Sequence, residues 1–319
     1  NQFTLFKFGP GGNIILQKAY AGSISPRGID VDARGNIYIT GACYGSVTLD
    51  GNTIFTSSNS AFFARFTSSF ICQWAKTGYN SSNTTEAYGI SVDKTPDHNI
   101  YDVGTYITSA TFGPFTPSGP ASQTTGYLAK LDTLGNFSYV FNTGTSTQGF
   151  NAKAVLADNA ANIVVTGMHG STFTVGSSTF FGASMYITKY DPFGSVLWTN
   201  DAAQVTSSSR CEGTSLTQDA SGNYYVLGTV LNSVDFHNGI TVAALSKSVN
   251  SFVAKYNNSG VCQWAKGDLS LSNDWNRGAA IDPAGNILVY GQFNQLTNKS
   301  GNTTNLFSYE NADIGSATQ

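Results

Sequence analysis

A short turn motif that recurs at a nearly constant spacing limits the folds open to this chain more than any other feature. Its first copy is the pentapeptide DARGN at residues 32–36, followed by the apolar run 37–39. The asparagine before each apolar run stands at position 36, 99, 162, 223 or 286, so successive copies lie 63, 63, 61 and 63 residues apart. A period this regular indicates one structural unit repeated along the chain.

Each copy of the motif lies between two short apolar segments. In the first repeat, Gly28–Val31 leads into the turn and Asn36–Ile39 leads out of it. The Asp of the motif can bond the backbone two residues on, while Gly and Asn accept positive φ, which is the chemistry of a hairpin turn. We therefore expect a β-hairpin at every copy and a structural role for the recurring Asp.

A second kind of hairpin alternates with the first. In the first repeat it joins Phe62–Phe66 to Ile71–Lys76. In all five copies, the residue that closes the first strand precedes a marker side chain by eight residues: 8 and 16, 66 and 74, 131 and 139, 190 and 198, 256 and 264. Five copies of each hairpin predict five units of four strands.

Four antiparallel strands per ~62 residues, without a helical period, predict an all-β fold: a single β-propeller of five four-stranded blades. The chain starts with a hairpin of the second kind, Phe3–Tyr20, and its last hairpin of the first kind, Arg277–Gly291, lacks such a partner downstream. We therefore expect the N-terminal hairpin to pair with the C-terminal blade and close the ring. Residues 1–319 then form one domain with blades at about 25–78, 86–144, 150–201, 210–268, and 275–319 together with 1–22.

The two halves of the repeat, G-I-x-V-D-x-x-G-N-I-Y-I-T-G and F-V-A-K-Y-x-x-x-G-x-x-x-W-A-K, resemble the SBBP-type bacterial β-propeller repeat. The first half is also similar to NHL-type propeller repeats. The resemblance covers nearly the whole chain and implies an extracellular or cell-surface protein with a binding or scaffolding role. It carries no catalytic residues to transfer, and because a propeller hosts many functions the activity has to be argued from the site.

Charge is scarce in this chain. Asp, Glu, Lys and Arg make up 11% of the residues, the net charge is −3 and the pI is near 5.5. No nucleic-acid partner is expected, because binding one needs a basic stripe that releases counterions. No membrane span is expected either, since no apolar run approaches the ~18 residues that one needs.

We expect a non-enzymatic protein, secreted or exposed on a cell or particle surface, that acts as a binding, adhesion or structural assembly module. Two other functions stay open. A carbohydrate-binding propeller lectin would need an aromatic and polar set repeated in every blade. A propeller enzyme would need a convergent acid, base or metal set at the mouth of the central channel.

One set of side chains is a candidate ligand site. The entry to the strand expected to be innermost brings to comparable points of the ring Arg27, Tyr88, Lys153, Thr214 and Arg277, with Trp275 two residues before the last. Cations and aromatic side chains near one channel mouth would suit an anionic or sugar ligand. The alternative is that these residues cap strand ends and face water.

No cofactor, metal or catalytic residue is expected. Cys72 and Cys262 occupy a repeat position that otherwise holds Ile, Phe or Val, so packing as small apolar side chains is the leading interpretation. A disulfide of Cys43 with Cys72, or of Cys211 with Cys262, stays open. Residues 30–36 lack the distal Glu of a calcium loop, and the histidines at 98, 169 and 237 have no recurring neighbour that predicts a triad.

Long linkers join the two kinds of hairpin, as at residues 42–61 and 292–319. Connections of ~20 residues in a compact domain are usually functional or locally folded. We expect protein partners or surface glycans to bind through these inter-hairpin linkers. A module of this kind would suit a larger surface assembly, filament or particle.

Overall fold

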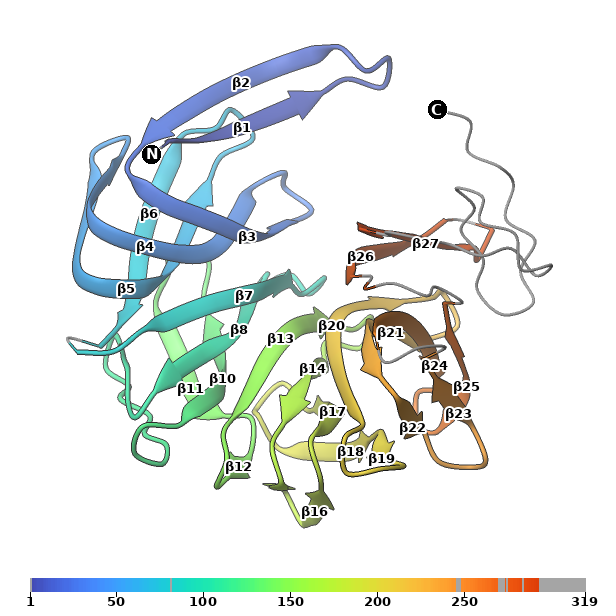
Figure 1. The fold of residues 1–319 in the computed structure, drawn as a ribbon. Coiled ribbons are helices and arrows are strands. Elements are labelled where there is room, and N and C mark those ends of the chain that lie inside the picture. The colour runs from blue at the N-terminus through green and yellow to red at the C-terminus, as the bar shows by residue number, and fades with distance from the viewer. Residues whose placement is uncertain are drawn as a thin grey trace. The chain divides into compact units, whose positions relative to one another are not determined.

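The computed structural model describes residues 2–80, 82–244, 248–268, 273, 275–282 and 284–292, with only the backbone for 275–277. Within these ranges the chain forms twenty-seven β-strands and no helix (Figure 1). The described residues fall into two compact units, the first comprising 1–145 and 155–161 and the second 146–154 and the chain from 162 on. The all-β prediction is therefore confirmed for the described part of the chain.

The first unit contains three sheets. A two-stranded sheet pairs β1 (Gln2–Phe8) with β2 (Ile14–Ala21). A five-stranded sheet has the order β3 (Ser23–Val31), β4 (Ile37–Leu49), β5 (Asn52–Phe66), β6 (Cys72–Tyr79) and β9 (Thr111–Phe112). A four-stranded sheet has the order β7 (Thr85–Val92), β8 (Ile100–Ile107), β10 (Thr124–Leu131) and β11 (Phe137–Asn142).

The second unit repeats this plan. One four-stranded sheet has the order β13 (Phe150–Ala157), β14 (Ile163–His169), β17 (Ser184–Tyr190) and β18 (Val196–Asp201), with the end of β13 grouped in the first unit. Another has the order β20 (Arg210–Gln218), β21 (Tyr224–Leu231), β24 (Val249–Tyr256) and β25 (Cys262–Gly267). A two-stranded sheet pairs β26 (Trp275–Ile281) with β27 (Ile287–Gln292).

The recurring turn is held together by its aspartate. Asp32 Oδ1 accepts the backbone N–H groups of Arg34 and Asn36, each at 2.9 Å, and Oδ2 accepts the Asn36 amide at 2.7 Å. Burial opposes ionisation of Asp32, but the hydrogen bonds outweigh it and hold the pKa of this carboxyl below its ordinary value. The same three bonds recur at Asp219 and Asp282, so the structural role predicted for this residue is confirmed.

A tryptophan on the last strand of one sheet packs on a turn of the next sheet. In the second unit, Trp198 Nε1 donates to the Asn258 carbonyl at 3.0 Å, and its indole lies against Gly260, which has a φ of +80°. Trp74 and Gly135 repeat this arrangement in the first unit, again with an indole hydrogen bond of 3.0 Å to a turn carbonyl. The repeated tryptophans therefore join neighbouring sheets, as the sequence predicts.

The linkers between the two kinds of hairpin are short β-hairpins with buried apolar side chains. Three of the strands involved extend the end of the preceding sheet: β9 pairs with β6, β15 (Thr172–Val175) with β12 (Thr145–Ser146), and β22 (Ser233–Asp235) with β19 (Ala203–Gln204). Strands β16 (Ser178–Phe181) and β23 (Thr241–Ala243) complete the second and third of these hairpins. The linkers are thus locally folded, because alternate apolar residues are buried: Val47, Leu49, Phe112, Phe173, Val175, Val234 and Phe236.

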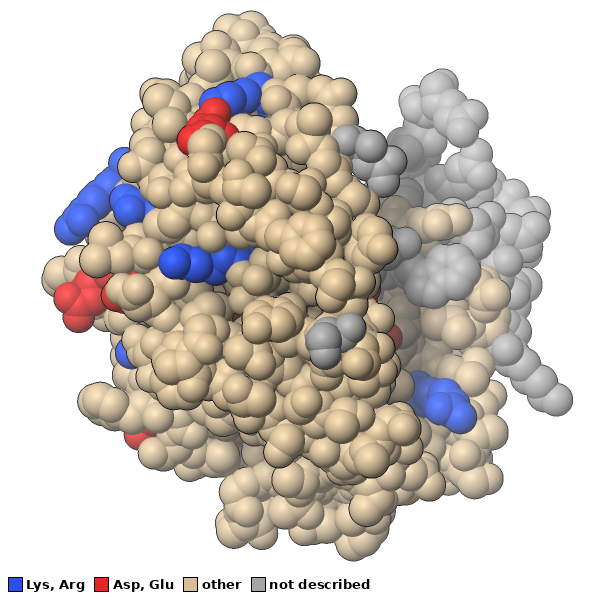
Figure 2. All heavy atoms as spheres, turned by 90° about the vertical axis from the view of Figure 1, so that its left-hand side faces the viewer, with Lys and Arg blue, Asp and Glu red and all other residues tan. Residues whose placement is uncertain are grey.

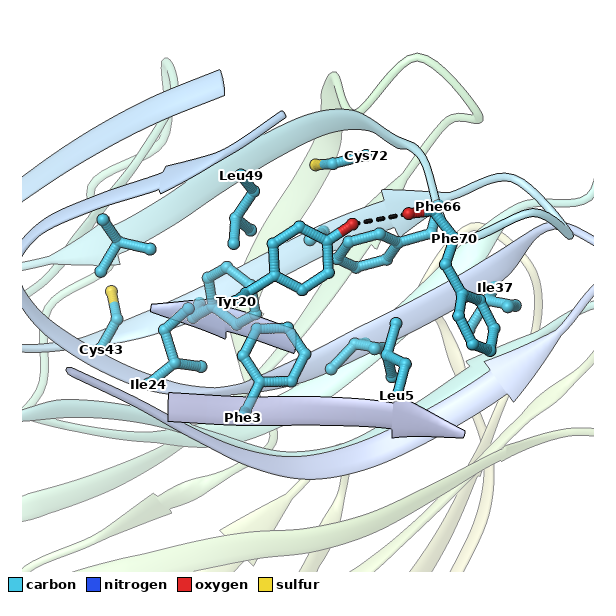
Figure 3. Packing of buried hydrophobic residues seen from close by; sticks show 14 residues of the cluster. Phe3, Leu5, Tyr20, Ile24, Ile37, Cys43, Leu49, Phe66, Phe70 and Cys72 are labelled. Atoms are coloured by element: carbon cyan, nitrogen blue, oxygen red, sulfur yellow. Dashed lines mark hydrogen bonds between the residues drawn. The ribbon is translucent and has the colours of Figure 1, made fainter. Parts of the chain in front are cut away.

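The β1–β2 hairpin packs on the first large sheet through aromatic side chains (Figure 3). Phe3 and Tyr20 stack with their ring centroids 5.2 Å apart, and Leu5 is buried in the same cluster. The Tyr20 hydroxyl oxygen lies 2.6 Å from the Phe70 carbonyl oxygen and 2.8 Å from Asp50 Oδ2, so its one proton can serve either acceptor. This face of the hairpin is therefore part of the core of the first unit.

The glycine under Trp198 offers a test of the contact between neighbouring sheets. In Gly260→Ala, the new methyl group would lie 2.6 Å from the indole, at a residue with positive φ. We expect the free energy of unfolding to fall by about 2–5 kcal/mol, from backbone strain of ~1–2 kcal/mol and crowding of ~1–3 kcal/mol, measured by urea denaturation. Gly239→Ala is the control, because Gly239 has a φ of +74° and open space around it. Equal losses in the two variants would contradict the packing role.

Candidate functional site

Two of the residues predicted at the channel mouth meet in the first unit, around a carboxylate. The Arg27 guanidinium binds Glu86 through two hydrogen bonds of 2.8 and 3.1 Å and lies over the Tyr88 ring, 4.5 Å from its centroid. The Tyr88 hydroxyl donates to Glu86 at 2.5 Å, and the Asn59 amide donates at 2.9 Å. Burial opposes ionisation of Glu86, but hydrogen bonds from Tyr88 and Arg27 outweigh it and lower its pKa. Glu86 therefore neutralises the Arg27 cation.

The other predicted residues lie in the second unit or outside the described side chains. Lys153 is on β13, and Thr214 is on β20. The side chains of Trp275 and Arg277, on β26, lie outside the described residues. The ligand site of the sequence analysis stays a prediction, and among its described side chains Arg27 and Tyr88 are brought together in the structure.

Two glutamates, each two residues before a predicted mouth residue, make polar contacts with the preceding repeat. Glu86 precedes Tyr88 in this way, and Glu212 precedes Thr214. Glu86 accepts the Arg27 guanidinium, and Glu212 accepts the Asn151 amide at 3.0 Å. These contacts connect neighbouring strands, an arrangement that neither the ligand-site prediction nor the alternative of capped, water-facing strand ends includes. The sequence signal for them is the Glu that stands at the same repeat position in both copies.

A fully buried carboxyl group lies on β8, in the four-stranded sheet of the first unit. Asp102 occupies the repeat position held elsewhere by Ile39, Val165, Val226 and Val289. Burial raises the pKa of Asp102 well above its ordinary value, which favours the protonated form.

The two oxygens of Asp102 fit this neutral form. Oδ1 accepts the Tyr127 hydroxyl at 2.9 Å. Oδ2 is buried without a hydrogen-bond partner, and the neighbouring Thr40 hydroxyl donates to the Phe62 carbonyl at 3.0 Å. An unpaired buried oxygen costs more free energy in a carboxylate than in a neutral acid, which again favours the protonated form.

Two histidines flank one aspartate in the second unit. His237 Nε2 donates to Asp201 Oδ1 at 2.8 Å, and His169 Nε2 lies 4.0 Å from Oδ2. His169 Nδ1 bonds the Gly170 carbonyl at 2.8 Å, and its ring stacks on Phe173. Burial lowers the pKa of His169, with Gly170 and Asp201 opposing the effect.

These three residues come from three elements: the end of β14, the end of β18 and the turn between β22 and β23. The Asp–His pairs thus tie a linker hairpin to the preceding sheet. No spacing in the sequence predicts the cluster, because His169 and Asp201 lie 32 residues apart in one repeat and His237 comes from the next.

The described residues offer little support for a metal site or for disulfide bonds. Among them, no group of three His, Cys, Asp or Glu side chains could hold a metal ion. Asp30 instead accepts the backbone N–H groups of Val31 at 2.8 Å and Val92 at 2.7 Å. The four cysteines are buried and free, so neither of the two possible disulfides forms. The described part of the chain contains no helix long and apolar enough to cross a membrane.

Repeated four-stranded antiparallel sheets, joined by the same turns and the same tryptophan contacts, define an all-β repeat protein of the propeller type. Comparison with known proteins agrees at this level. The chain is 25% identical over 339 aligned residues to an uncharacterised WD repeat-containing protein of Acanthamoeba polyphaga mimivirus, covering 84% of this chain and 24% of that protein. The chain thus spans about a quarter of the length of this curated relative. No protein-family model matches the sequence.

Solved structures resemble the chain only distantly. A protein of unknown function from Bacteroides caccae aligns over 83% of this chain and 70% of its own, with 12% identity and a TM-score of 0.39. A catalytically inactive virginiamycin B lyase from Staphylococcus aureus, solved with quinupristin, aligns over 91% and 96%, with 12% identity and a TM-score of 0.34.

The buried acid makes stability depend on pH. Because the pKa of Asp102 is raised in the folded state, unfolding releases a proton above pH ~4, so stability falls as the pH rises towards the folded pKa, by up to about 1.4 kcal/mol per pH unit. Asp102→Asn keeps the shape and an oxygen that accepts the Tyr127 hydroxyl, but it cannot ionise. We expect urea denaturation to show that this variant gains stability relative to the parent between pH 5 and pH 8. A constant difference across that range would contradict a protonated Asp102.

Proposed function

We propose that the chain is a five-bladed β-propeller that serves as a non-enzymatic protein-interaction module, secreted or exposed on a cell or particle surface. The resemblance of its repeats to SBBP-type repeats and its similarity to a WD repeat-containing protein support this function. The scarcity of charge supports it too, since the face in Figure 2 carries few Lys, Arg, Asp or Glu side chains among uncharged ones. Its recognition elements are the linker hairpins.

Two incomplete sheets support the proposed closure of the ring. β1–β2 corresponds to the second hairpin of a blade and β26–β27 to the first, so together they supply the four strands of a fifth blade. In complete blades, Ile39 pairs with Ala64 and Val226 pairs with Ala254. The equivalent pair in the fifth blade is Phe6 with Val289.

Exposure of side chains at the chain ends supports this pairing. Phe8 is 59% exposed, whereas its counterparts Phe66 and Tyr256 are fully buried. Tyr290 is 66% exposed, whereas its counterpart Leu227 is fully buried. Apolar side chains that every complete blade buries would be covered if the two hairpins joined.

The observation that carries the interaction function is a repeated exposed aromatic side chain. Phe55 and Phe181 occupy the same position of two linker hairpins, one in each unit, since Phe55 pairs with Ser46 and Phe181 with Thr172. They are 74% and 71% exposed. A single exposed Phe needs no explanation, but aromatic side chains repeated on the same element are typical anchors of protein interfaces.

Engineered cysteines test the closed ring. In the double variant Phe6→Cys, Val289→Cys, the proposed register brings the two sulfurs within bonding distance, so oxidation should give an intramolecular disulfide in a monomer, detected by mass spectrometry. The control, Phe6→Cys with Leu288→Cys, is one residue out of register and places the thiols on opposite faces. A disulfide-linked dimer would instead mean that the hairpins pair between two copies.

Photo-crosslinking tests the interaction function. With a photoreactive phenylalanine analogue in place of Phe55 or Phe181, we expect covalent adducts with a partner protein on the intact source surface, resolved by gel shift and mass spectrometry. The control position is Phe193, 86% exposed in the turn between β17 and β18 and outside the linkers. Adducts that form equally at Phe193, or at none of the three, would rule out the linker hairpins as recognition elements.

A further inference from the structure

A groove of about 540 Å³ lies beside the outer strand of the first large sheet, within the first unit. Its lining includes Lys76, Thr77 and Tyr79 of β6, Gly113 and Pro114 after β9, and Phe137 at the start of β11. Lys76 is the one charged side chain among the described residues that line it. The groove thus combines a single cation with apolar and hydroxyl groups.

The same repeat position at the neighbouring contact shows what the groove lacks. Lys18 corresponds to Lys76, since each stands two residues after the marker of its hairpin. Asp50 binds the Lys18 ammonium at 2.6 and 2.8 Å and also accepts the Tyr20 hydroxyl and the Cys72 N–H, each at 2.8 Å. A carboxylate therefore fills this position between the β1–β2 hairpin and the first large sheet.

Between the first and second large sheets the carboxylate is missing. Asp50 follows Leu49 with a φ of 48°, and its counterpart Gly113 follows Phe112 with a φ of 55°. Both preceding side chains are fully buried, which fixes the two turns in the same register. At the second contact Lys76 is present, but Gly113 stands where the first contact has Asp50. The absence of a side chain at Gly113 leaves room for an anionic group from another molecule.

The equivalent position in the second unit is closed instead. Asn200 replaces Lys76 there, and its amide donates across the contact to the Gly260 carbonyl at 3.1 Å. Ala203 stands in place of Tyr79 and Cys262 in place of Phe137. A lysine also stands at this repeat position in the second unit, at Lys266, but the contact at Asn200 lacks the cation and both aromatic side chains. The fold therefore does not require them.

The edge of β6 adds a means of binding an extended chain. Within the described residues, this edge has a partner strand only at Gly78 and Tyr79, where β9 pairs antiparallel with it. The groove runs along the preceding residues Ala75, Lys76 and Thr77. A strand edge next to a groove is the arrangement that binds peptides by strand addition, with side-chain pockets giving specificity.

We propose that this groove binds an extended peptide segment of a protein partner, whose Asp or Glu side chain occupies the place that Asp50 fills at the neighbouring contact. The acidic group pairs with the Lys76 ammonium, and flanking side chains lie against Tyr79, Pro114 and Phe137. The proposal rests on the interaction function given above and names the chemistry of the segment recognised.

The test uses the full chain and a set of capped octapeptides in which one Glu is flanked by Thr and Val in varied order, together with the same set carrying Gln. By fluorescence polarisation, we expect members of the Glu set to bind saturably and their Gln counterparts to bind at least about tenfold more weakly. Lys76→Ala should weaken the Glu peptides by a similar factor. Arg34→Ala is the matched control, because it removes one exposed cation of the same unit far along the chain from the groove.

A second variant tests the groove without removing the Lys76 cation. Gly113→Asp restores the acidic residue at a φ close to that of Asp50, so it should pair with Lys76 and block peptide binding. Because the new Cβ would lie 3.1 Å from the Phe137 ring, urea denaturation checks that the variant is folded. The proposal is overturned if no Glu peptide binds, if Gln peptides bind equally, or if Lys76→Ala and Gly113→Asp leave binding unchanged. Crosslinking at Phe55 and Phe181 tests the interaction function separately, so failure of one proposal can be told from failure of the other.

Discussion

The hydrogen bonds of one aspartate per repeat are the constraint on which the rest of the structure depends. In each hairpin of the first kind, a carboxylate such as that of Asp32 satisfies two backbone N–H groups and fixes the following Asn. The turn therefore sets the register of both strands, which decides which side chains face the next sheet. The apolar runs are too short to form a stable hairpin in water by themselves. They form strands here because the hydrogen bonds of the aspartate fix the turn between them.

A second interaction recurs at the contacts between sheets: a large aromatic side chain of one sheet packs against a glycine in a turn of the next. Trp74 meets Gly135 and Trp198 meets Gly260. Where the first residue of the pair is Leu16 rather than Trp, the turn residue is Phe70, and both belong to the same hydrophobic cluster. Volume is thus conserved across the contact while the residues that supply it change, as expected for close-packed interiors.

The sequence predicted the elements that repeat and missed the groups that do not. Spacing and turn chemistry were enough to place both kinds of hairpin, because local hydrogen bonds determine them. Asp102, by contrast, is a single polar residue at an apolar repeat position, and its protonated state follows from burial that only the fold reveals. The approach of His169 and His237 to Asp201 joins the ends of two strands of one repeat to a linker turn of the next, and no shared spacing reveals it.

The left-handed residue of the linker turn has a consequence for how such a protein can diverge. Asp50, Gly113 and His237 all hold this backbone position, with φ between 48° and 68°, while their side chains bind Lys18, leave space beside Lys76 or bond Asp201. Backbone geometry is constant here and chemistry is variable. A single substitution at this position could replace an internal hydrogen bond with open space for a ligand, because the backbone conformation stays the same. Each repeat could therefore acquire a different partner independently of its neighbours.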